Sequence, residues 1–350
     1  AKKHAVVVGG LGIIGRHFIS ALEADGGWSI TTLSRRKPDF RTTAKAIQVD
    51  LLDRKGAEQK LSGLTKTTHI FYSALAGGIA AENVEGNVNL VKHSVGPISK
   101  VAPNLQRVVL SQGGKFYGCH LGYHKTPSIE TDPRHMPPNF YYDQQDALAR
   151  MQKGKKWTYA LVRPEVVVGY AQGIPLNFFA ILAIYATICR ELKVPLNFPG
   201  PDTAFNALNR YTDADLLGRS MLWMATEPKC ANQAFNMTND SGFRWTNIWG
   251  DIANYFGCTP GVCMPFNVSA FMEDKRPVWN RIMKKHKLKA DLYDKVSWEF
   301  ADWNFNRTWD TLLEDVKRIQ YGFHEVMDSW DCYKATFDKM RKNKAIPVYK

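Results

Sequence analysis

Three glycines near the N-terminus have the spacing of a phosphate-binding turn. Gly9, Gly12 and Gly15 follow an apolar run at 6–8 and precede a helical pattern at 16–24. A glycine-rich turn lets the backbone approach a pyrophosphate, which then faces unpaired N–H groups at a helix N-terminus. The same spacing occurs in ordinary turns, but its place between a strand and a helix favours a dinucleotide site. The expected contacts there are Gly9, Gly12, Ile13, Ile14 and Gly15.

The second apolar run ends in a basic segment, Ser34-Arg35-Arg36-Lys37. An acidic residue at this point would bind the ribose of NAD, whereas guanidinium groups bind a 2′-phosphate through paired hydrogen bonds. A solvated basic turn is the alternative interpretation. We expect NADPH or NADP⁺, held in part by Ser34, Arg35 and Arg36. Asp50, with Leu51 beside it, ends the third apolar run and is placed to accept a hydrogen bond from the adenine amino group.

A catalytic tyrosine and lysine are not spaced in the usual way. Short-chain dehydrogenases carry the two residues four apart on one helix face, where the ammonium lowers the pKa of the phenol. Here the positions four residues after Tyr141 and Tyr142 are Gln145 and Asp146. Either this chemistry is lost or the lysine comes from another segment.

The elements that must position these groups alternate between β-branched runs and helical stretches. A spacing of about 20 residues between the runs favours a parallel, doubly wound α/β sheet of the Rossmann type over an antiparallel arrangement, since hairpins need only short loops. We expect this domain at 1–165 and a mostly helical substrate-binding region at 166–350, with the run at 233–238 able to rejoin the sheet. The expected strands are 5–8, 29–33, 46–49, 68–72, 107–111 and 158–162.

Seven short motifs then occur in the order found in one known family. They are Gly9-Gly10-Leu11-Gly12-Ile13-Ile14-Gly15, Gly113-Gly114-Lys115-Phe116-Tyr117, Asn139-Phe140-Tyr141-Tyr142, Arg163-Pro164, Tyr185-Ala186-Thr187-Ile188-Cys189, Asp213-Ala214-Asp215-Leu216 and Ala234-Phe235-Asn236. The chain resembles the progesterone 5β-reductase/iridoid synthase family of short-chain dehydrogenases/reductases over nearly its whole length.

The resemblance implies roles for individual residues. It makes Lys115, after the fifth strand, and Tyr142 the catalytic pair. Hydride addition to the β-carbon of an enone drives negative charge onto the carbonyl oxygen, which a phenol and an ammonium can stabilise. The resemblance also implies that the Val166 backbone contacts the nicotinamide carboxamide and that Phe300 caps the substrate pocket. Without it, Tyr142 would be an ordinary half-buried helix residue and Phe300 a core residue.

Departures from the family pattern concern the expected substrate pocket. Leu75 stands where the plant enzymes have tryptophan, which predicts a pocket of different shape. Before Lys115 the family commonly has Gln-Thr-Gly, whereas this chain has Ser111-Gln112-Gly113, so Gln112 stands at the threonine position. Glu165 replaces a residue that is often uncharged. A carboxylate beside the nicotinamide could bind an amine-bearing substrate. We therefore place Leu75, Gln112, Glu165 and Phe300 in the substrate pocket.

Composition restricts the partners. The net charge of +13 is spread along the chain, and its densest runs, 281–289 and 334–344, are more typical of solvated helix faces than of a nucleic-acid groove. The six cysteines are too scattered for a zinc site and suit a reduced, cytoplasmic protein, and no apolar run spans a bilayer. We expect a small-molecule substrate, no metal, no nucleic acid and no membrane partner, and a homodimer stays open.

These observations predict an NADPH-dependent reductase of an activated alkene or a carbonyl in a small apolar, secondary-metabolite-like substrate. One alternative is a non-redox isomerase or cyclase that uses bound NADP as a scaffold. Another is an NADP-sensing regulator without turnover, which would need neither Tyr142 nor Lys115. A nucleotide-sugar epimerase normally needs the four-residue tyrosine and lysine spacing that is absent here.

Overall fold

The computed structural model describes residues 2–77 and 82–349, which form two compact units. The chain up to Val167 belongs to the first unit, together with Ala214–Thr238 and Leu313–Glu325. The second unit comprises Val168–Asp213, Asn239–Leu312 and the chain from Val326 onward. A single boundary at 165/166 therefore does not describe the division, because two later segments also belong to the first unit.

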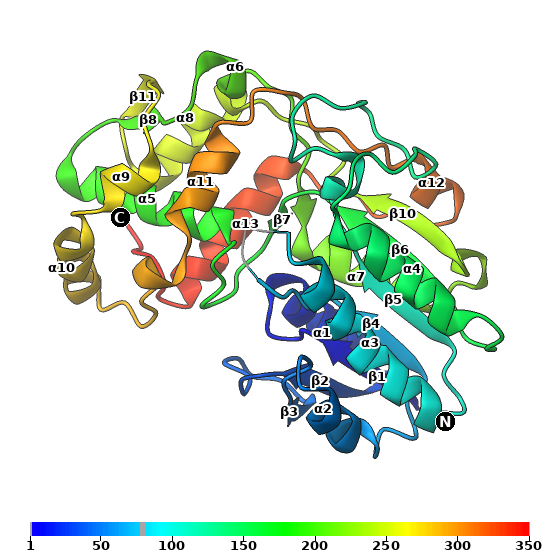
Figure 1. Ribbon diagram of the computed structural model, residues 1–350. Coiled ribbons are helices and arrows are strands. Elements are labelled where there is room, and N and C mark those ends of the chain that lie inside the picture. Colours follow the sequence, from blue (N-terminus) through cyan, green and yellow to red (C-terminus); the bar gives the residue numbers. More distant parts are fainter. Residues whose placement is uncertain (1, 78–81, 350) are drawn as a thin grey trace. The chain divides into compact units, whose positions relative to one another are not determined.

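The first unit is built on a seven-stranded sheet in the order β10-β6-β5-β4-β1-β2-β3, with every pairing parallel (Figure 1). Its central strands are almost continuously apolar, as expected where both faces of a sheet are covered. The predicted Rossmann-type fold is confirmed, and the run near 233 does pair with β6. The strands are β1 Lys3–Val8, β2 Trp28–Ser34, β3 Lys45–Gln48, β4 His69–Tyr72, β5 Arg107–Ser111, β6 Thr158–Pro164 and β10 Gln233–Met237.

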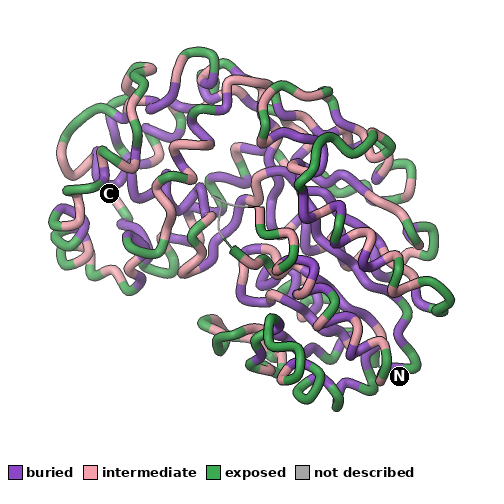
Figure 2. Tube along the Cα trace, viewed as in Figure 1, coloured by how far each residue is buried: buried purple, intermediate pink, exposed green. Residues whose placement is uncertain are grey.

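Helices of the first unit pack in two groups. The first group contains α1 and α7, and the second contains α2, α3 and α4. The strands between them are largely buried (Figure 2), and one apolar core includes Val6, Ile70 and Val108. The helices are α1 Ile13–Asp25, α2 Arg54–Leu61, α3 Val84–Val101, α4 Phe140–Gln152, α7 Ala214–Thr226 and α12 Val316–Gln320, with 3-10 turns at Gly114–Tyr117 and Pro228–Cys230.

The strand order reverses between β1 and β4, which are neighbours in the sheet. In doubly wound sheets, ligands bind outside the carboxyl ends of the strands at such a reversal. Gly9 follows β1, Ser73 follows β4 and Gln112 follows β5. The topology therefore brings several of the segments singled out from the sequence to one edge of the sheet.

The second unit surrounds helix α5, in which every residue from Phe178 to Cys189 is buried. Its Phe178 ring packs edge to face with Trp245 and with Phe305, and the rings of Trp245 and Phe305 are tilted against each other. The high aromatic content thus serves largely to fill this core. The elements are α5 Phe178–Leu192, β8 Leu196–Phe198, α6 Asp202–Phe205, β9 Thr212–Asp213, α8 Trp245–Phe256, β11 Pro260–Cys263, α9 Val268–Met272, α10 Arg276–His286, α11 Trp298–Phe305 and α13 Ser329–Lys342, with a 3-10 turn at Tyr293–Lys295; the short β7, Val167–Val168, spans the junction of the two units in sequence. Among the described residues, no helix combines the length and the hydropathy that crossing a bilayer requires.

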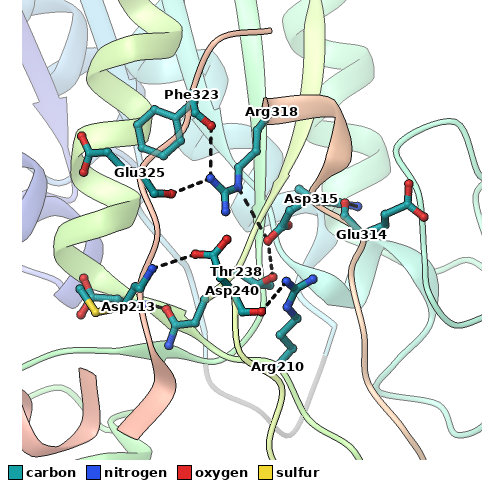
Figure 3. A network of polar contacts seen from close by, with 12 residues as sticks. Arg210, Asp213, Thr238, Asp240, Glu314, Asp315, Arg318, Phe323 and Glu325 are labelled. Atoms are coloured by element: carbon teal, nitrogen blue, oxygen red, sulfur yellow. Dashed lines mark hydrogen bonds and ion pairs between the residues drawn. The ribbon is translucent and has the colours of Figure 1, made fainter. Parts of the chain in front are cut away.

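A buried arginine, Arg318, joins several residues within the late segment Leu313–Glu325 of the first unit (Figure 3). The Arg318 guanidinium donates to the carbonyls of Phe323 and Glu325, at 3.3 and 2.7 Å, and lies 3.7 Å from the Asp315 carboxylate. That carboxylate also accepts a 2.8 Å hydrogen bond from Thr238, directly after β10. The segment is therefore held at the end of the last strand of the sheet.

Candidate functional site

The glycine turn has the geometry of a phosphate cradle. Gly9 adopts a left-handed conformation, with φ of 82°, and a Cβ there would lie 2.7 Å from the Ala74 nitrogen. A Cβ on Gly15 would lie 2.3 Å from the Gly9 oxygen, so both positions require glycine. Gly12 differs, because its Cβ would meet only the Gly9 oxygen, at 3.5 Å. The open Gly12 side and the first turn of α1 fit an anionic phosphate group.

The basic segment lies at the carboxyl end of β2, as expected. Arg35 and Arg36 are exposed, and the Arg36 N–H donates to the Ser34 hydroxyl at 3.2 Å. Sequence reasoning missed Arg16, which directly follows the third glycine of the turn. Its buried guanidinium donates to the Leu11 carbonyl at 3.0 Å and to Asp39 at 2.8 Å. The glycine turn and the chain after β2 are thus tied together.

Asp50 and Leu51 occupy the turn after the third strand. The Asp50 carboxylate accepts a 2.9 Å hydrogen bond from the Leu52 N–H and is exposed, so its other oxygen is accessible to a ligand. Leu51 is buried, and its carbonyl accepts a 2.7 Å contact from the His93 ring. The contacts of both residues with an adenine stay predictions.

The two adjacent tyrosines of the Asn-Phe-Tyr-Tyr motif have different surroundings. Tyr142 is buried, and its hydroxyl donates to the Phe116 carbonyl at 2.7 Å. The same oxygen accepts a 2.8 Å hydrogen bond from the His135 N–H. The Tyr142 hydroxyl therefore both donates to and accepts from the protein backbone. This argues against the catalytic role that the resemblance implies for Tyr142.

The Tyr141 hydroxyl lies instead beside Gly113, at the carboxyl end of β5. A Cβ on Gly113 would be 3.0 Å from this oxygen and 3.5 Å from the Pro164 carbonyl, so glycine leaves space between them. Within the described part of the chain, the hydroxyl has no hydrogen-bond partner. Burial raises the pKa of Tyr141, with nearby Cys119 and Glu165 adding to the effect. The group is a protonated donor at neutral pH.

Lys115 lies beside the start of α4 and is paired with a carboxylate that the sequence analysis did not identify. Its ammonium is 2.6 Å from Glu82 Oε2, 3.7 Å from the centre of the Phe140 ring and 5.3 Å from that of Tyr141. Burial lowers the pKa of Lys115, and the hydrogen bond and charge of Glu82 oppose this effect. The Lys115 carbonyl accepts a 2.9 Å hydrogen bond from Asn139, the N-cap of α4.

The Gln112 side chain is hydrogen-bonded to the backbone of the tyrosine segment. Its side-chain nitrogen donates to the Tyr141 carbonyl at 3.1 Å, and its side-chain oxygen accepts from Arg163 at 2.9 Å. Arg163 in turn lies 3.4 Å from the centre of the Phe116 ring. Gln112 is buried and engaged at both ends of its amide, so it holds other site residues in place. Its predicted contact with a substrate is untested.

Glu165 is also buried, and its carboxylate occupies the space beside Gly114. A Cβ on Gly114 would be 1.8 Å from Glu165 Oε2, and the Cys119 thiol lies 3.8 Å from the same oxygen. A side chain at position 114 would therefore require the Glu165 carboxylate to move. Recognition of an amine by this carboxylate stays a prediction.

The sequence profile described as a PRISE-like Rossmann-fold domain matches residues 44–347. The chain belongs to the PRISE-like Rossmann-fold family. This confirms the resemblance and, at the level of the family, the prediction of an oxidoreductase of the short-chain dehydrogenase type.

Two relatives illustrate the range of the PRISE-like family. The short chain dehydrogenase gsfE of Penicillium aethiopicum is 30% identical over 381 residues, which cover 99% of each chain. The (S)-8-oxocitronellyl enol synthase of Catharanthus roseus is 31% identical over 365 residues, covering 99% of this chain and 93% of its own. Among solved structures, the UDP-glucose 4-epimerase of Brucella ovis in complex with NAD has a TM-score of 0.68 at 16% identity, with 95% of this chain and 97% of that chain covered, and shows a shared fold.

Three further residues were predicted to contact the cofactor or the substrate: Leu75, Val166 and Phe300. Leu75 is exposed in the chain after β4, and Val166 is partly exposed, two residues after β6. Phe300 belongs to the second unit, on α11, where its ring stacks on Trp303 with the centres 6.0 Å apart. Their contacts with cofactor or substrate stay predictions. No cluster of His, Cys, Asp and Glu that could hold a metal ion is found among the described residues.

Proposed function

We propose that this protein is an NADPH-dependent reductase of a small apolar enone, enal or carbonyl compound. The observation that carries the proposal is the Tyr141 hydroxyl, a protonated donor without a hydrogen-bond partner among the described residues, with the Lys115 ammonium near its ring. Both residues lie in the unit that contains the glycine turn of Gly9, Gly12 and Gly15. The open side of Gly12 and the exposed Arg35 and Arg36 suit a dinucleotide with a 2′-phosphate.

In the proposed reaction, the substrate receives a hydride at carbon and a proton at its carbonyl oxygen. When bound, NADPH supplies a hydride, which forms a C–H bond at the β-carbon while the alkene electrons move toward the carbonyl oxygen. Tyr141 donates its hydroxyl hydrogen to that oxygen, and the Lys115 charge stabilises the developing enolate. The raised Tyr141 pKa keeps the phenol protonated before hydride transfer, and the nearby Lys115 charge favours the phenolate that remains once the proton is donated. For a ketone or aldehyde, the hydride adds to the carbonyl carbon and the same two residues serve the alkoxide.

The relatives support an enol or enolate product at this site. One is named as an enol synthase of an oxocitronellyl compound and another as a short chain dehydrogenase, and both align over almost the whole chain. The substrate class we propose is therefore a small terpenoid-like or other secondary-metabolite carbonyl compound.

The test is the loss of NADPH absorbance with a panel of small enones, enals, ketones and cyclic imines, using the wild type, Tyr141→Phe and Tyr142→Phe. We expect turnover in the wild type and a fall in kcat of about 10²-fold or more in Tyr141→Phe, the usual contribution of a general acid. Tyr142→Phe should retain most of kcat and instead lose stability, because its hydroxyl bonds only to backbone. Full activity of Tyr141→Phe would refute the assignment.

Two other outcomes have distinct meanings. Conversion of a substrate without net NADPH consumption would favour a non-redox isomerase or cyclase that uses the same residues. Tight NADPH binding without conversion of any compound would favour the sensor. Either result overturns the reductase proposal.

A further inference from the structure

Glu82 links two parts of the candidate site with the two oxygens of one carboxylate. Oε2 lies 2.6 Å from the Lys115 ammonium, and Oε1 accepts a 2.5 Å hydrogen bond from the Phe140 N–H. Phe140 is the first residue of α4, which carries Tyr141 in its first turn. One side chain therefore contacts both the lysine and the start of the tyrosine helix.

The surroundings of this pair make the contact strong. The Lys115 and Glu82 side chains are only 20% and 21% exposed, so water screens their charges little. The aromatic face of Phe140 lies under the ammonium, and Asn139 fixes the Lys115 backbone. An ammonium in such a pocket needs a nearby anion, because burial without a partner favours the neutral amine.

We propose that Glu82 is the positioning residue that keeps Lys115 charged and directed toward Tyr141. In short-chain dehydrogenases with the usual spacing, one helix holds the lysine beside the tyrosine. Here, Glu82 would hold Lys115 beside the helix that carries Tyr141. The inference rests on the proposed function for its catalytic meaning, but the state of Lys115 can be measured without turnover. Glu82 itself need not touch the substrate.

The sign of the expected change follows from the groups around the ammonium. Burial lowers the Lys115 pKa, whereas Glu82 and the Cys119 thiol raise it. The nearby His120 ring has a pKa lowered to about 4, mainly by burial and then by Lys115, so it is neutral at working pH. Tyr141 is also neutral, because its pKa is raised. Removing the Glu82 charge should therefore lower the Lys115 pKa further.

The decisive measurement is the pH dependence of Lys115 acylation by a small amine-reactive reagent, followed by peptide mass spectrometry. The variants are Glu82→Gln and Glu85→Gln, the latter an exposed carboxylate in the first turn of α3. We expect the Lys115 titration to move down by about one unit in Glu82→Gln, a typical effect of losing a close charge partner. Glu85→Gln should leave it unchanged. An unmoved Lys115 titration in Glu82→Gln would overturn the proposal.

Activity distinguishes this inference from the proposed function. If the protein is a reductase, the alkaline limb of kcat should shift to lower pH in Glu82→Gln, with little change in the KM for NADPH. A shifted Lys115 titration in a protein without reductase activity would refute the function and retain the Glu82 contact. Normal reductase activity of Glu82→Gln, with an unshifted pH profile of kcat, would retain the proposed function and refute the role of Glu82. If thermal melting shows that Glu82→Gln folds poorly, Glu82→Asp replaces it, because the shorter side chain keeps the charge but cannot reach both Lys115 and the Phe140 N–H. The alkaline limb of kcat for Glu82→Asp should then lie below that of the wild type and above that expected for Glu82→Gln.

Discussion

The proposed 2′-phosphate site depends on single side chains at the end of β2. Arg36 is exposed, and a charged hydrogen bond is worth about 1.5–3 kcal/mol, or about 10- to 100-fold in affinity. Arg36→Ala should therefore raise the KM for NADPH by about that factor and leave the KM for NADH almost unchanged. Arg41→Ala, an exposed arginine seven residues from the end of β2, serves as the control. Equal losses with both cofactors would count against the 2′-phosphate contact.

Single residues also mark the limit of prediction from sequence. The glycine turn was recognisable because its spacing and its place after a strand are local. Tyr141 and Tyr142 could not be distinguished in that way, because their difference lies in the backbone carbonyl of Phe116 and the N–H of His135. Glu82 escaped notice for the same reason, since its partner Lys115 is 33 residues away.

At the scale of elements, Arg318 binds three residues of its own segment, Leu313–Glu325, and one of them, Asp315, also accepts a hydrogen bond from Thr238 after β10 (Figure 3). Removing one partner of a buried ion pair leaves the other charge uncompensated and costs about 3–5 kcal/mol. Arg318→Met should remove the positive charge that faces the Asp315 carboxylate and the donor to the carbonyls of Phe323 and Glu325. We expect a melting temperature lower by about 10 °C, measured by calorimetry.

A matched control for Arg318 is available on α2. Arg54 lies 3.5 Å from Glu58, but both side chains are well exposed, and such pairs contribute about 0–1 kcal/mol. Arg54→Met should therefore change the melting temperature by no more than a few degrees. Similar melting temperatures for the two variants would mean that the buried network adds little to stability.

The elements themselves were largely predictable, because strand and helix patterns are local and the spacing of the runs implied parallel connections. The return of β10 to the sheet was anticipated from its apolar run at 233–238. The place of Leu313–Glu325 in the first unit was not anticipated, since it involves a hydrogen bond from Thr238 to Asp315, 77 residues apart in sequence. Long-range polar contacts of this kind leave no periodic pattern.

At the scale of the whole molecule, the charge of +13 is explained in part by helix ends. The last turn of α10 carries Lys284 and Lys285, and that of α13 carries Lys339, Arg341 and Lys342. Cations at these ends interact favourably with the negative end of the helix dipole. Several are also engaged, as Lys285 is 3.0 Å from Glu191 and Arg341 donates to the Tyr255 carbonyl at 2.9 Å. Lys285 and Arg341 therefore have partners within the second unit.

This distribution predicts weak, sequence-independent binding to nucleic acid. In fluorescence anisotropy with a labelled 20-base-pair duplex, any affinity at 50 mM salt should fall at least about tenfold at 200 mM, as expected for phosphate contacts alone. The double variant Lys284→Gln/Lys342→Gln should weaken the low-salt binding further and leave NADPH turnover unchanged, because neither residue is near the glycine turn in sequence or belongs to its unit. A dissociation constant below about 10⁻⁷ M at 200 mM salt, or discrimination between duplex sequences, would instead make the positive charge a functional surface.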